Sequence, residues 1–378
     1  MVLFPSQKRS TTDVVIIGGG PAGLAAAIAL RRKGIASTVV DALEPPIDKG
    51  CGEGLMPDAL DSLKALGIEI SEEDGYPLQG IRFANSRHRV EARFPNGTGF
   101  GVRRTHLHQK MCDHARDVGV KLSWRSHATL LKGGKLLIDG EEVRHRWLIG
   151  ADGTSSQVRR WAGLDRDKAF SQRFGFRRHY EAAPWSEYVE IHWGSTGQIY
   201  ITPVAPNRVC VVLITRNRKV DRDNFFEGFP EIAQRLKGAP METMQRGAVS
   251  VTRKLKRVAN ETVALIGDAS GSADSITGEG LALSFRQAIA LAASIERGGL
   301  AEYDRTHPSI GRLPQTMAKL MLSLDRWPSL ERRSLGVLAS DESLFQELLS
   351  VHMGIAKLPS FVVRRGPRLG WRLLSSDC

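Results

Sequence analysis

A short hydrophobic segment that runs directly into a glycine-rich turn constrains this chain more than any other feature. Four β-forming residues, Val14–Ile17, precede Gly18-Gly19-Gly20-Pro21-Ala22-Gly23, which has the spacing G-x-G-x-x-G. An alanine-rich segment of helical composition follows, and a second β-forming run, Ser37–Val40, ends at Asp41. This order of strand, turn, helix, strand and acidic residue is typical of a βαβ unit that binds a dinucleotide.

Each part of that unit has a physical role. Gly18 permits the tight turn, Gly20 lets the backbone approach a pyrophosphate, and Gly23 lets the helix pack closely on the strand. The helix that begins at Pro21-Ala22 directs unpaired N–H groups and a partial positive charge at the phosphates. Asp41 follows at a distance where a carboxylate accepts hydrogen bonds from ribose hydroxyl groups.

Composition is that of a soluble globular protein, with 42% hydrophobic and 25% charged residues among 378. The length predicts two or three domain-sized units. The net charge of +12 is high, but the basic residues are dispersed in short pairs and no nucleic-acid motif is present. We therefore expect no nucleic-acid partner, and attribute the charge to attraction of a phosphorylated cofactor and to loose contact with a membrane surface.

The cysteines and the ends of the chain limit the function classes further. Cys51, Cys112, Cys210 and Cys378 are far apart and form no C-x-x-C pair, so we predict neither a metal site nor a disulfide framework. No signal peptide is recognisable, and no apolar run approaches the roughly 20 residues that span a bilayer. We expect a cytoplasmic protein, with membrane association as an open alternative.

Two further glycine-containing corners occur later in the chain. Leu148–Gly153 ends in Ala-Asp-Gly, and Ala264–Gly271 contains Gly267-Asp268 and is followed by Thr277-Gly278-Glu279-Gly280-Leu281. With the first turn, these corners give the chain a resemblance to the flavin-dependent group A monooxygenase superfamily, which also contains geranylgeranyl reductases and flavin halogenases. The resemblance covers roughly residues 12–300.

The resemblance implies FAD as the cofactor. Asp268 would contact the ribityl chain, where a carboxylate gains charge-assisted hydrogen bonds. Asp152-Gly153 would support the pyrophosphate region. Backbone N–H groups of Gly278, Glu279, Gly280 and Leu281 would lie near the flavin pyrimidine ring, where a helix N-terminus stabilises the negative charge that develops on reduction.

Two other segments match the family. Val102–Leu107 resembles its R-x-x-L segment, so Arg104 would reach the pyrophosphate side with help from Gln109; the alternative is a solvated arginine pair. The histidines of the same predicted helix are interpreted as surface or packing residues: His106, His108 and His114. The loop Lys49–Leu55 would run beside the isoalloxazine, where glycines such as Gly52 permit close approach to a flat ring. Cys51 would either modulate the flavin or the substrate, or serve as a small packing residue.

The predicted fold class is α/β: a Rossmann-like FAD-binding domain of the glutathione-reductase type, interleaved with an antiparallel-sheet substrate domain and followed by a helical C-terminal segment. The predicted FAD-binding domain comprises residues 10–75, 103–165 and 262–300, the substrate domain residues 76–102 and 166–261, and the helical region residues 301–378. A helix is expected over Phe225–Lys237 within the substrate domain.

The reaction is less well defined than the cofactor. Flavin halogenases carry W-x-W-x-I-P and geranylgeranyl reductases Y-x-W-x-F-P where this chain has Gln198-Ile199-Tyr200-Ile201-Thr202-Pro203. We therefore favour an NAD(P)H-dependent monooxygenase that hydroxylates a hydrophobic aromatic or polyketide-like small molecule. The alternatives are a flavoenzyme that reduces prenyl C=C bonds and a flavin-binding module without turnover. His192 and Tyr200 are hypothesised to border the substrate pocket.

The C-terminal region combines helical apolar spacing with basic residues. Arg364, Arg365, Arg368 and Arg372 stand near Phe361, Leu369 and Trp371. These helices are interpreted as packing over the substrate domain, with peripheral membrane contact as the alternative.

Overall fold

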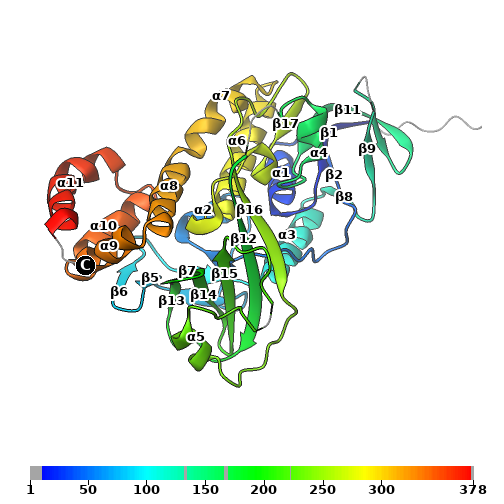
Figure 1. Ribbon diagram of the computed structural model, residues 1–378. Coiled ribbons are helices and arrows are strands. Elements are labelled where there is room, and N and C mark those ends of the chain that lie inside the picture. The colour runs from blue at the N-terminus through cyan, green and yellow to red at the C-terminus, as the bar shows by residue number, and fades with distance from the viewer. Residues whose placement is uncertain (1–10, 132–133, 166–168, 222, 376–378) are drawn as a thin grey trace, which may run out of the picture.

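Two large β-sheets, a small third sheet and a group of C-terminal helices are the main parts of the molecule, as a computed structural model shows (Figure 1). The structure describes residues 11–131, 134–165, 169–221 and 223–375. Position 10, where the predicted FAD-binding domain begins, and Cys378 lie outside these ranges. Cys51, Cys112 and Cys210 are free thiols. The arrangement confirms the predicted fold class of a Rossmann-like sheet, an antiparallel sheet and a helical C-terminal segment.

The first sheet is parallel in the order β8-β2-β1-β11-β17. Its strands and the helices of the same part of the chain are β1 (Thr11–Ile17), α1 (Pro21–Arg32), β2 (Ser37–Val40), α2 (Pro57–Ala65), α3 (Arg104–Asp117), β8 (Lys121–Ser123), β11 (Glu141–Gly150), α4 (Gln157–Trp161), β17 (Val263–Leu265) and α6 (Gly280–Glu296). Val14, Val15 and Ile16 are completely buried, as expected where helices cover both faces of a parallel sheet. β11 also pairs with β10 (Leu136–Ile138), which pairs with β9 (Ala128–Leu130).

The second sheet has the order β16-β12-β15-β14-β13-β5-β6 and lies below the first in Figure 1. Its strands are β16 (Arg246–Arg253), β12 (Ala169–Glu181), β15 (Arg208–Thr215), β14 (Gly197–Ala205), β13 (Tyr188–Gly194), β5 (Gly80–Ala84) and β6 (Arg89–Arg93). All pairs are antiparallel except β5 with β13. A small third sheet joins β3 (Gly54–Leu55), β7 (Gly99–Gly101) and β4 (Tyr76–Leu78).

The two faces of the second sheet pack against different parts of the molecule. Ile199 and Val211 point toward α5 (Pro230–Arg235) and belong to one apolar cluster. Tyr200 and Val212 point the other way and belong to a second cluster, which includes the C-terminal helices. Successive side chains of a strand alternate between faces, so β14 and β15 each contribute to both clusters.

The helices after α6 extend to the left in Figure 1; the first of them packs against α6, and the later ones belong to the cluster on that second face. They are α7 (Ala301–Ile310), α8 (Arg312–Arg326), α9 (Pro328–Ala339), α10 (Glu342–His352) and α11 (Leu358–Ser375). Met321, Leu335 and Phe345 contribute to the shared cluster with Phe83 and Trp193 of the sheet. A search of the described ranges finds no helix with the length and apolar character needed to cross a membrane.

One predicted helix is wrong in its extent. Instead of covering Phe225–Lys237, the helix α5 occupies only Pro230–Arg235. Turns precede it, with Gly228 at a positive φ of 84°, and proline favours the first helical position. Phe225 and Phe229 are buried in the cluster beneath the sheet. The apolar residues before Pro230 therefore pack beneath the sheet from turns and do not extend the helix.

Candidate cofactor site

The glycine-rich turn between β1 and α1 is as tight as its motif predicts. Gly18 has a φ of 109°, and a Cβ at this position would collide with the backbone of Ala151. A Cβ at Gly23 would collide with the carbonyl oxygen of Gly18. A Cβ at Gly20, in contrast, would have only Nη2 of Arg104 as a neighbour, at 4.0 Å. Gly18 and Gly23 therefore serve the packing of the turn, and Gly20 leaves space where a pyrophosphate would approach.

Asp41 lies beside this turn, at the end of β2. Its carboxylate accepts hydrogen bonds from the backbone N–H of Gly19 (2.6 Å) and of Leu43 (2.8 Å). A carboxylate has about four acceptor positions, so capacity remains for a ribose hydroxyl. The buried His108 of α3 donates from Nε2 to the carbonyl oxygen of Gly19 (2.8 Å), and the ring of Trp124 fills the space where a Cβ at Gly19 would lie.

The helix α3 brings Arg104 to the turn. Arg104 is only 8% exposed, and its Nε is a buried donor without a hydrogen-bond partner among the described residues. A buried, unpaired guanidinium donor next to Gly20 matches the predicted contact with an anionic pyrophosphate. The amide of Gln109 donates within α3 to Asp113 (2.9 Å), and its assistance to Arg104 stays a prediction.

The second corner reaches the turn through its backbone. The N–H of Ala151 donates to the carbonyl oxygen of Ile17 (2.8 Å). The carboxylate of Asp152 instead accepts hydrogen bonds from the hydroxyl of Ser156 (2.5 Å) and the backbone N–H of Gln157 (2.6 Å). It therefore stabilises the first turn of α4, a role that the sequence interpretation did not assign to it.

Asp268 in the third corner stands opposite the loop that contains Lys49. One of its carboxylate oxygens accepts from Nζ of Lys49 and from Oγ1 of Thr154, both at 3.3 Å. The same Nζ is 3.8 Å from the position of a Cβ at Gly153. Asp268, Gly153 and Lys49 thus meet at one place, although they come from three distant segments.

The loop between Thr277 and α6 leaves space for a flat group. Gly278 has a left-handed φ of 71°, and its N–H donates to the carbonyl oxygen of Ser275 (3.0 Å). A Cβ at Gly278, Gly280 or Gly52 would meet no heavy atom within 4 Å. The first N–H groups of α6, which begins at Gly280, have no partner within the helix. The donors predicted for the flavin therefore come from residues after Gly278.

These features together fit FAD. The three open glycine positions suit a planar ring, the unpaired donor of Arg104 suits a pyrophosphate, and the carboxylates of Asp41 and Asp268 suit hydroxyl groups.

A buried ionic cluster below the Cys51–Gly54 loop was not predicted. Glu53 has a positive φ of 61° and a side chain without exposed surface. Its carboxylate accepts from the N–H of Arg104 (3.0 Å), from Nη1 of Arg177 (3.2 Å) and from Nε2 of His179 (2.7 Å). Arg177 and His179 alternate along β12 and so point to one face, the only sequence signal for this cluster. The cluster connects the loop to the second sheet.

Three residues of types that often bind metals, Glu53, His179 and Cys210, meet at the same place, but their environment does not favour metal binding. Atoms of Glu53, His179 and Cys210 lie within 4.8 Å of one another. The guanidinium of Arg177 already neutralises Glu53. Burial raises the pKa of Cys210 well above its usual range, so its thiol stays protonated, whereas a metal needs the thiolate.

Comparison with known proteins identifies the family. A family model described as an FAD binding domain matches residues 11–297. The chain belongs to this family of FAD-binding proteins. It is 27% identical over 336 residues to a menaquinone reductase of Mycolicibacterium smegmatis, covering 80% of each chain. It is also 27% identical over 303 residues to a digeranylgeranylglycerophospholipid reductase of Methanosarcina acetivorans, covering 71% of each chain.

The fold itself matches solved structures over nearly the full length. A flavoprotein/dehydrogenase from Cytophaga hutchinsonii has a TM-score of 0.80 at 17% identity, covering 97% of this chain and 100% of that chain. At this identity the match shows the fold alone. With the family match, the comparisons identify the protein as an FAD-dependent oxidoreductase.

The two residues hypothesised to border the substrate pocket, His192 and Tyr200, do not lie together. Tyr200 pairs with Ile191 across the strands, whereas His192 pairs with Ile199, so the two side chains lie on opposite faces of the sheet. Tyr200 faces the loop after Asp274 and donates its hydroxyl to the carbonyl oxygen of Ile276 (2.7 Å).

His192 instead belongs to an ionic group on the opposite face. Its Nε2 donates to Glu190 (2.8 Å), which also contacts Arg82. Burial alone would raise the pKa of Glu190, but the bond with His192 and the charge of Arg82 lower it to about 2. The expectation that His192 borders the pocket with Tyr200 is therefore wrong, because register determines the face of each side chain.

Cys51 lies between the candidate flavin loop and the second sheet. Its Sγ accepts from the backbone N–H of Glu53 (3.4 Å), and its carbonyl oxygen accepts from the thiol of Cys210 (3.7 Å). Cys51 is partly exposed and Cys210 is buried. Its position is compatible with contact to a bound ring, and these hydrogen bonds also give it a structural role.

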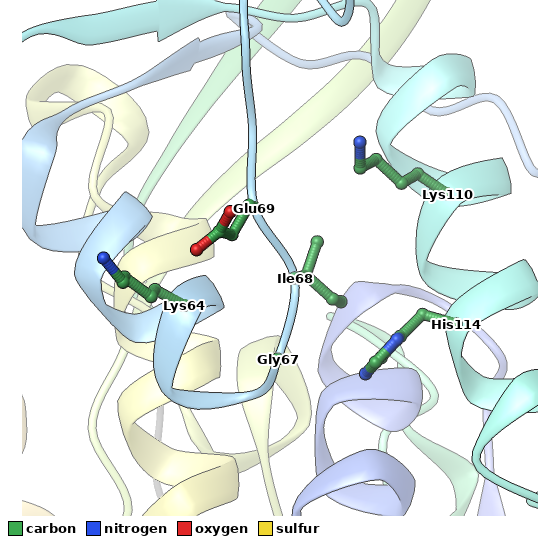
Figure 2. A pocket seen from close by; sticks show the side chains of 6 residues that line it. All are labelled: Lys64, Gly67, Ile68, Glu69, Lys110 and His114. Atoms are coloured by element: carbon green, nitrogen blue, oxygen red, sulfur yellow. The ribbon is translucent and has the colours of Figure 1, made fainter.

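A surface hollow of about 420 Å³ lies away from this site, between α2 and α3 (Figure 2). Its lining residues are Lys64, Gly67, Ile68, Glu69, Lys110 and His114. Lys110 is bound to both carboxylate oxygens of Asp74 at 2.8 Å, and His114 donates to the carbonyl oxygen of Leu66 (3.1 Å). Lys110 and His114 thus serve local structure, in agreement with the interpretation of His114 as a surface or packing residue.

Proposed function

We propose that this flavoenzyme reduces a carbon–carbon double bond in the isoprenoid chain of a lipid-like substrate. The observation that carries the proposal is the apolar cluster beside the flavin loops. Met56 and Ile276, which flank those loops, pack in one cluster with the face of the second sheet and with helices α8 to α10. Its buried phenol, Tyr200, has its hydroxyl bound to backbone, and a second tyrosine, Tyr76, packs against the cluster from a partly buried position. Such surroundings suit a hydrocarbon better than a polar ring.

The relatives support the same substrate class. Two of them, a menaquinone reductase and a digeranylgeranylglycerophospholipid reductase, are named for the reduction of molecules with isoprenoid chains. The chain covers most of the length of each, so the resemblance includes the substrate region as well as the cofactor-binding region.

The chain's own residues would hold the cofactor and exclude water. When bound, FAD supplies a hydride donor, and reduced nicotinamide is the proposed source of its electrons. Arg104 would bind the pyrophosphate, and Asp268 would bind the ribityl chain after releasing Lys49. The N-terminus of α6 would stabilise negative charge at the pyrimidine edge. The apolar cluster would orient the alkene and keep water away.

Hydroxylation remains the second candidate, because one stretch of sequence favours it. Gln198, Tyr200 and Thr202 stand where geranylgeranyl reductases carry the residues of Y-x-W-x-F-P. In that case an aromatic or polyketide-like molecule would occupy the same place.

One experiment distinguishes the candidates. Purified protein loaded with FAD is reduced under nitrogen with NADPH or dithionite and incubated with a lipid that carries isoprenoid chains but no quinone ring, and the product is examined by mass spectrometry. The proposal expects a gain of two hydrogens without oxygen. A product that gains one oxygen, and only in air, would establish the hydroxylase. Flavin that is reduced but transfers nothing to polyprenyl or aromatic substrates would support a binding module.

We also propose that α11 contacts an anionic lipid surface, where such a substrate would reside. Val363, Trp371 and Leu374 are 77%, 73% and 80% exposed, and their spacing places them on one face of the helix. Arg364 and Arg368 are exposed beside them, and α11 contains no acidic residue. Apolar side chains flanked by arginines are typical of helices that lie in a membrane interface.

A further inference from the structure

A buried group of charged side chains lies behind the loop that we expect to hold the flavin. Asp58 comes from the first turn of α2, Glu279 from the residue before α6, Arg286 from the second turn of α6, and His352 from the end of α10. Glu279 is only 3% exposed. Its backbone lies between Gly278 and Gly280, so this group is joined directly to the candidate cofactor loop.

The distances within this group are too long for direct hydrogen bonds. Nη2 of Arg286 is 3.7 Å from Asp58 Oδ2 and 3.9 Å from Glu279 Oε1, and Nδ1 of His352 is 3.8 Å from Glu279 Oε2. Within this group, four atoms are buried and have no hydrogen-bond partner among the described residues: Asp58 Oδ1, Glu279 Oε2, Arg286 Nε and Arg286 Nη2. Buried polar groups almost always have partners.

Water is the partner that fits these distances. Groups 3.7 to 3.9 Å apart can both bond to a water molecule that lies off the line between them, and a buried water needs two to four polar neighbours. We propose that Asp58, Glu279, Arg286 and His352 form a buried site that binds ordered water and keeps one exchangeable proton behind the flavin loop.

Charge explains why the site keeps a proton. Two carboxyl groups share a single cation, Arg286, because burial lowers the pKa of His352 to about 4 and keeps that ring neutral. Burial, and next the charge of Asp58, raise the pKa of Glu279 to about 8, and burial also raises the pKa of Asp58. Glu279 is the group that stays protonated at neutral pH, since two carboxylates close together resist double ionisation.

Every element packed around Glu279 contributes to this balance. The neighbouring charged or polar groups are Asp58 and Asp61 from α2, Thr277 from the preceding turn, Arg286 from α6 and His352 from α10. Because His352 belongs to α10, a movement of this C-terminal helix would change the surroundings of Glu279. A negative charge on the ring side of the loop would raise the affinity of Glu279 for its proton.

The first test uses the cofactor-free protein. Difference potentiometric titration of the wild type against Glu279→Gln between pH 6 and 10 is expected to show one proton released by the wild type alone, with a midpoint near pH 8. Asp58→Asn should move that midpoint to lower pH, because it removes a neighbouring negative charge, and it serves where Glu279→Gln fails to fold. Glu331→Gln, which removes a buried carboxyl on α9 bound to Asn85, should leave the midpoint unchanged.

The second test asks whether the site responds to the flavin. Proton uptake on two-electron reduction of bound FAD is measured at pH 9 with an indicator dye. Wild type should take up more protons than Glu279→Gln, and Glu331→Gln should match the wild type. Identical titrations of wild type and Glu279→Gln, or an unchanged midpoint in Asp58→Asn, would overturn the proton-holding site. Equal uptake at pH 9 would overturn its link to the flavin loop.

Discussion

Replacing Gly280 by alanine separates the role of this residue in cofactor binding from its role in folding. Gly280 is the first residue of α6, and a Cβ there would meet no heavy atom within 4 Å. The added methyl group therefore requires no rearrangement of the cofactor-free protein. Because alanine favours helix formation over glycine, the free energy of unfolding should stay unchanged or rise by up to about 1 kcal/mol.

The FAD complex should respond in the opposite direction. If the ring lies against Gly280, the methyl group occupies space that the ring needs, and such overpacking costs about 1–3 kcal/mol. This corresponds to an increase in the dissociation constant of roughly 5- to 150-fold. The assay is titration of cofactor-free protein with FAD, followed by quenching of flavin fluorescence, together with urea unfolding without FAD.

Gly299→Ala is the matched control. Gly299 follows the other end of α6, and a Cβ there also meets nothing within 4 Å. This variant should change neither FAD affinity nor, by more than a few tenths of a kcal/mol, stability. Wild-type FAD affinity in Gly280→Ala would refute the placement of the ring at this loop, and a clear loss of stability without FAD would refute the inference that the space is open.

Three further predictions concern the core, the cofactor and the membrane. Asp274→Asn removes the carboxylate that binds Nε and Nη2 of the buried Arg173 cation and leaves Asp325, at 3.8 Å from Nη1, as a more distant counter-charge. The variant should lower the free energy of unfolding in urea by about 3–5 kcal/mol, with much of the loss recovered when Arg173→Met is added; equal losses in the single and double variants would contradict the pairing. Asp268→Ala removes a charged acceptor and should weaken FAD binding by about 10- to 150-fold; fluorescence titration with wild-type affinity would exclude the ribityl contact. The double variant Trp371→Ser/Leu374→Ser should lose most co-sedimentation with anionic vesicles, whereas equal sedimentation would reject the docking face.

The sequence predicts those parts of the site that depend on local geometry. The turn at Gly18–Gly23 and the acid at Asp41 are separated by one helix, so their relation follows from the βαβ unit itself. Gly278 and Gly280 were assigned to the cofactor only through the family resemblance, because a glycine turn before a helix is by itself usually no more than a turn. The family resemblance added their assignment to different parts of FAD.

Contacts between residues that are far apart in the chain could not be predicted from the sequence. The side chain of Glu53 meets Arg177 and His179 more than 120 positions away, and Glu279 meets Asp58 from another helix. His192 was misplaced because its face depends on the register between β13 and β14, which alternation within one strand does not determine.

The strand pair β5–β13 has a consequence for how this enzyme can move. It joins residues 80–84 to residues 188–192, so the second sheet is completed by a segment that lies between two parts of the cofactor-binding region in the sequence. The polypeptide passes several times between the two halves, and a hinge would have to bend several connections at once. Entry of a bulky substrate would then require movement of the C-terminal helices. These helices belong to no sheet, so they could shift without breaking backbone hydrogen bonds between strands.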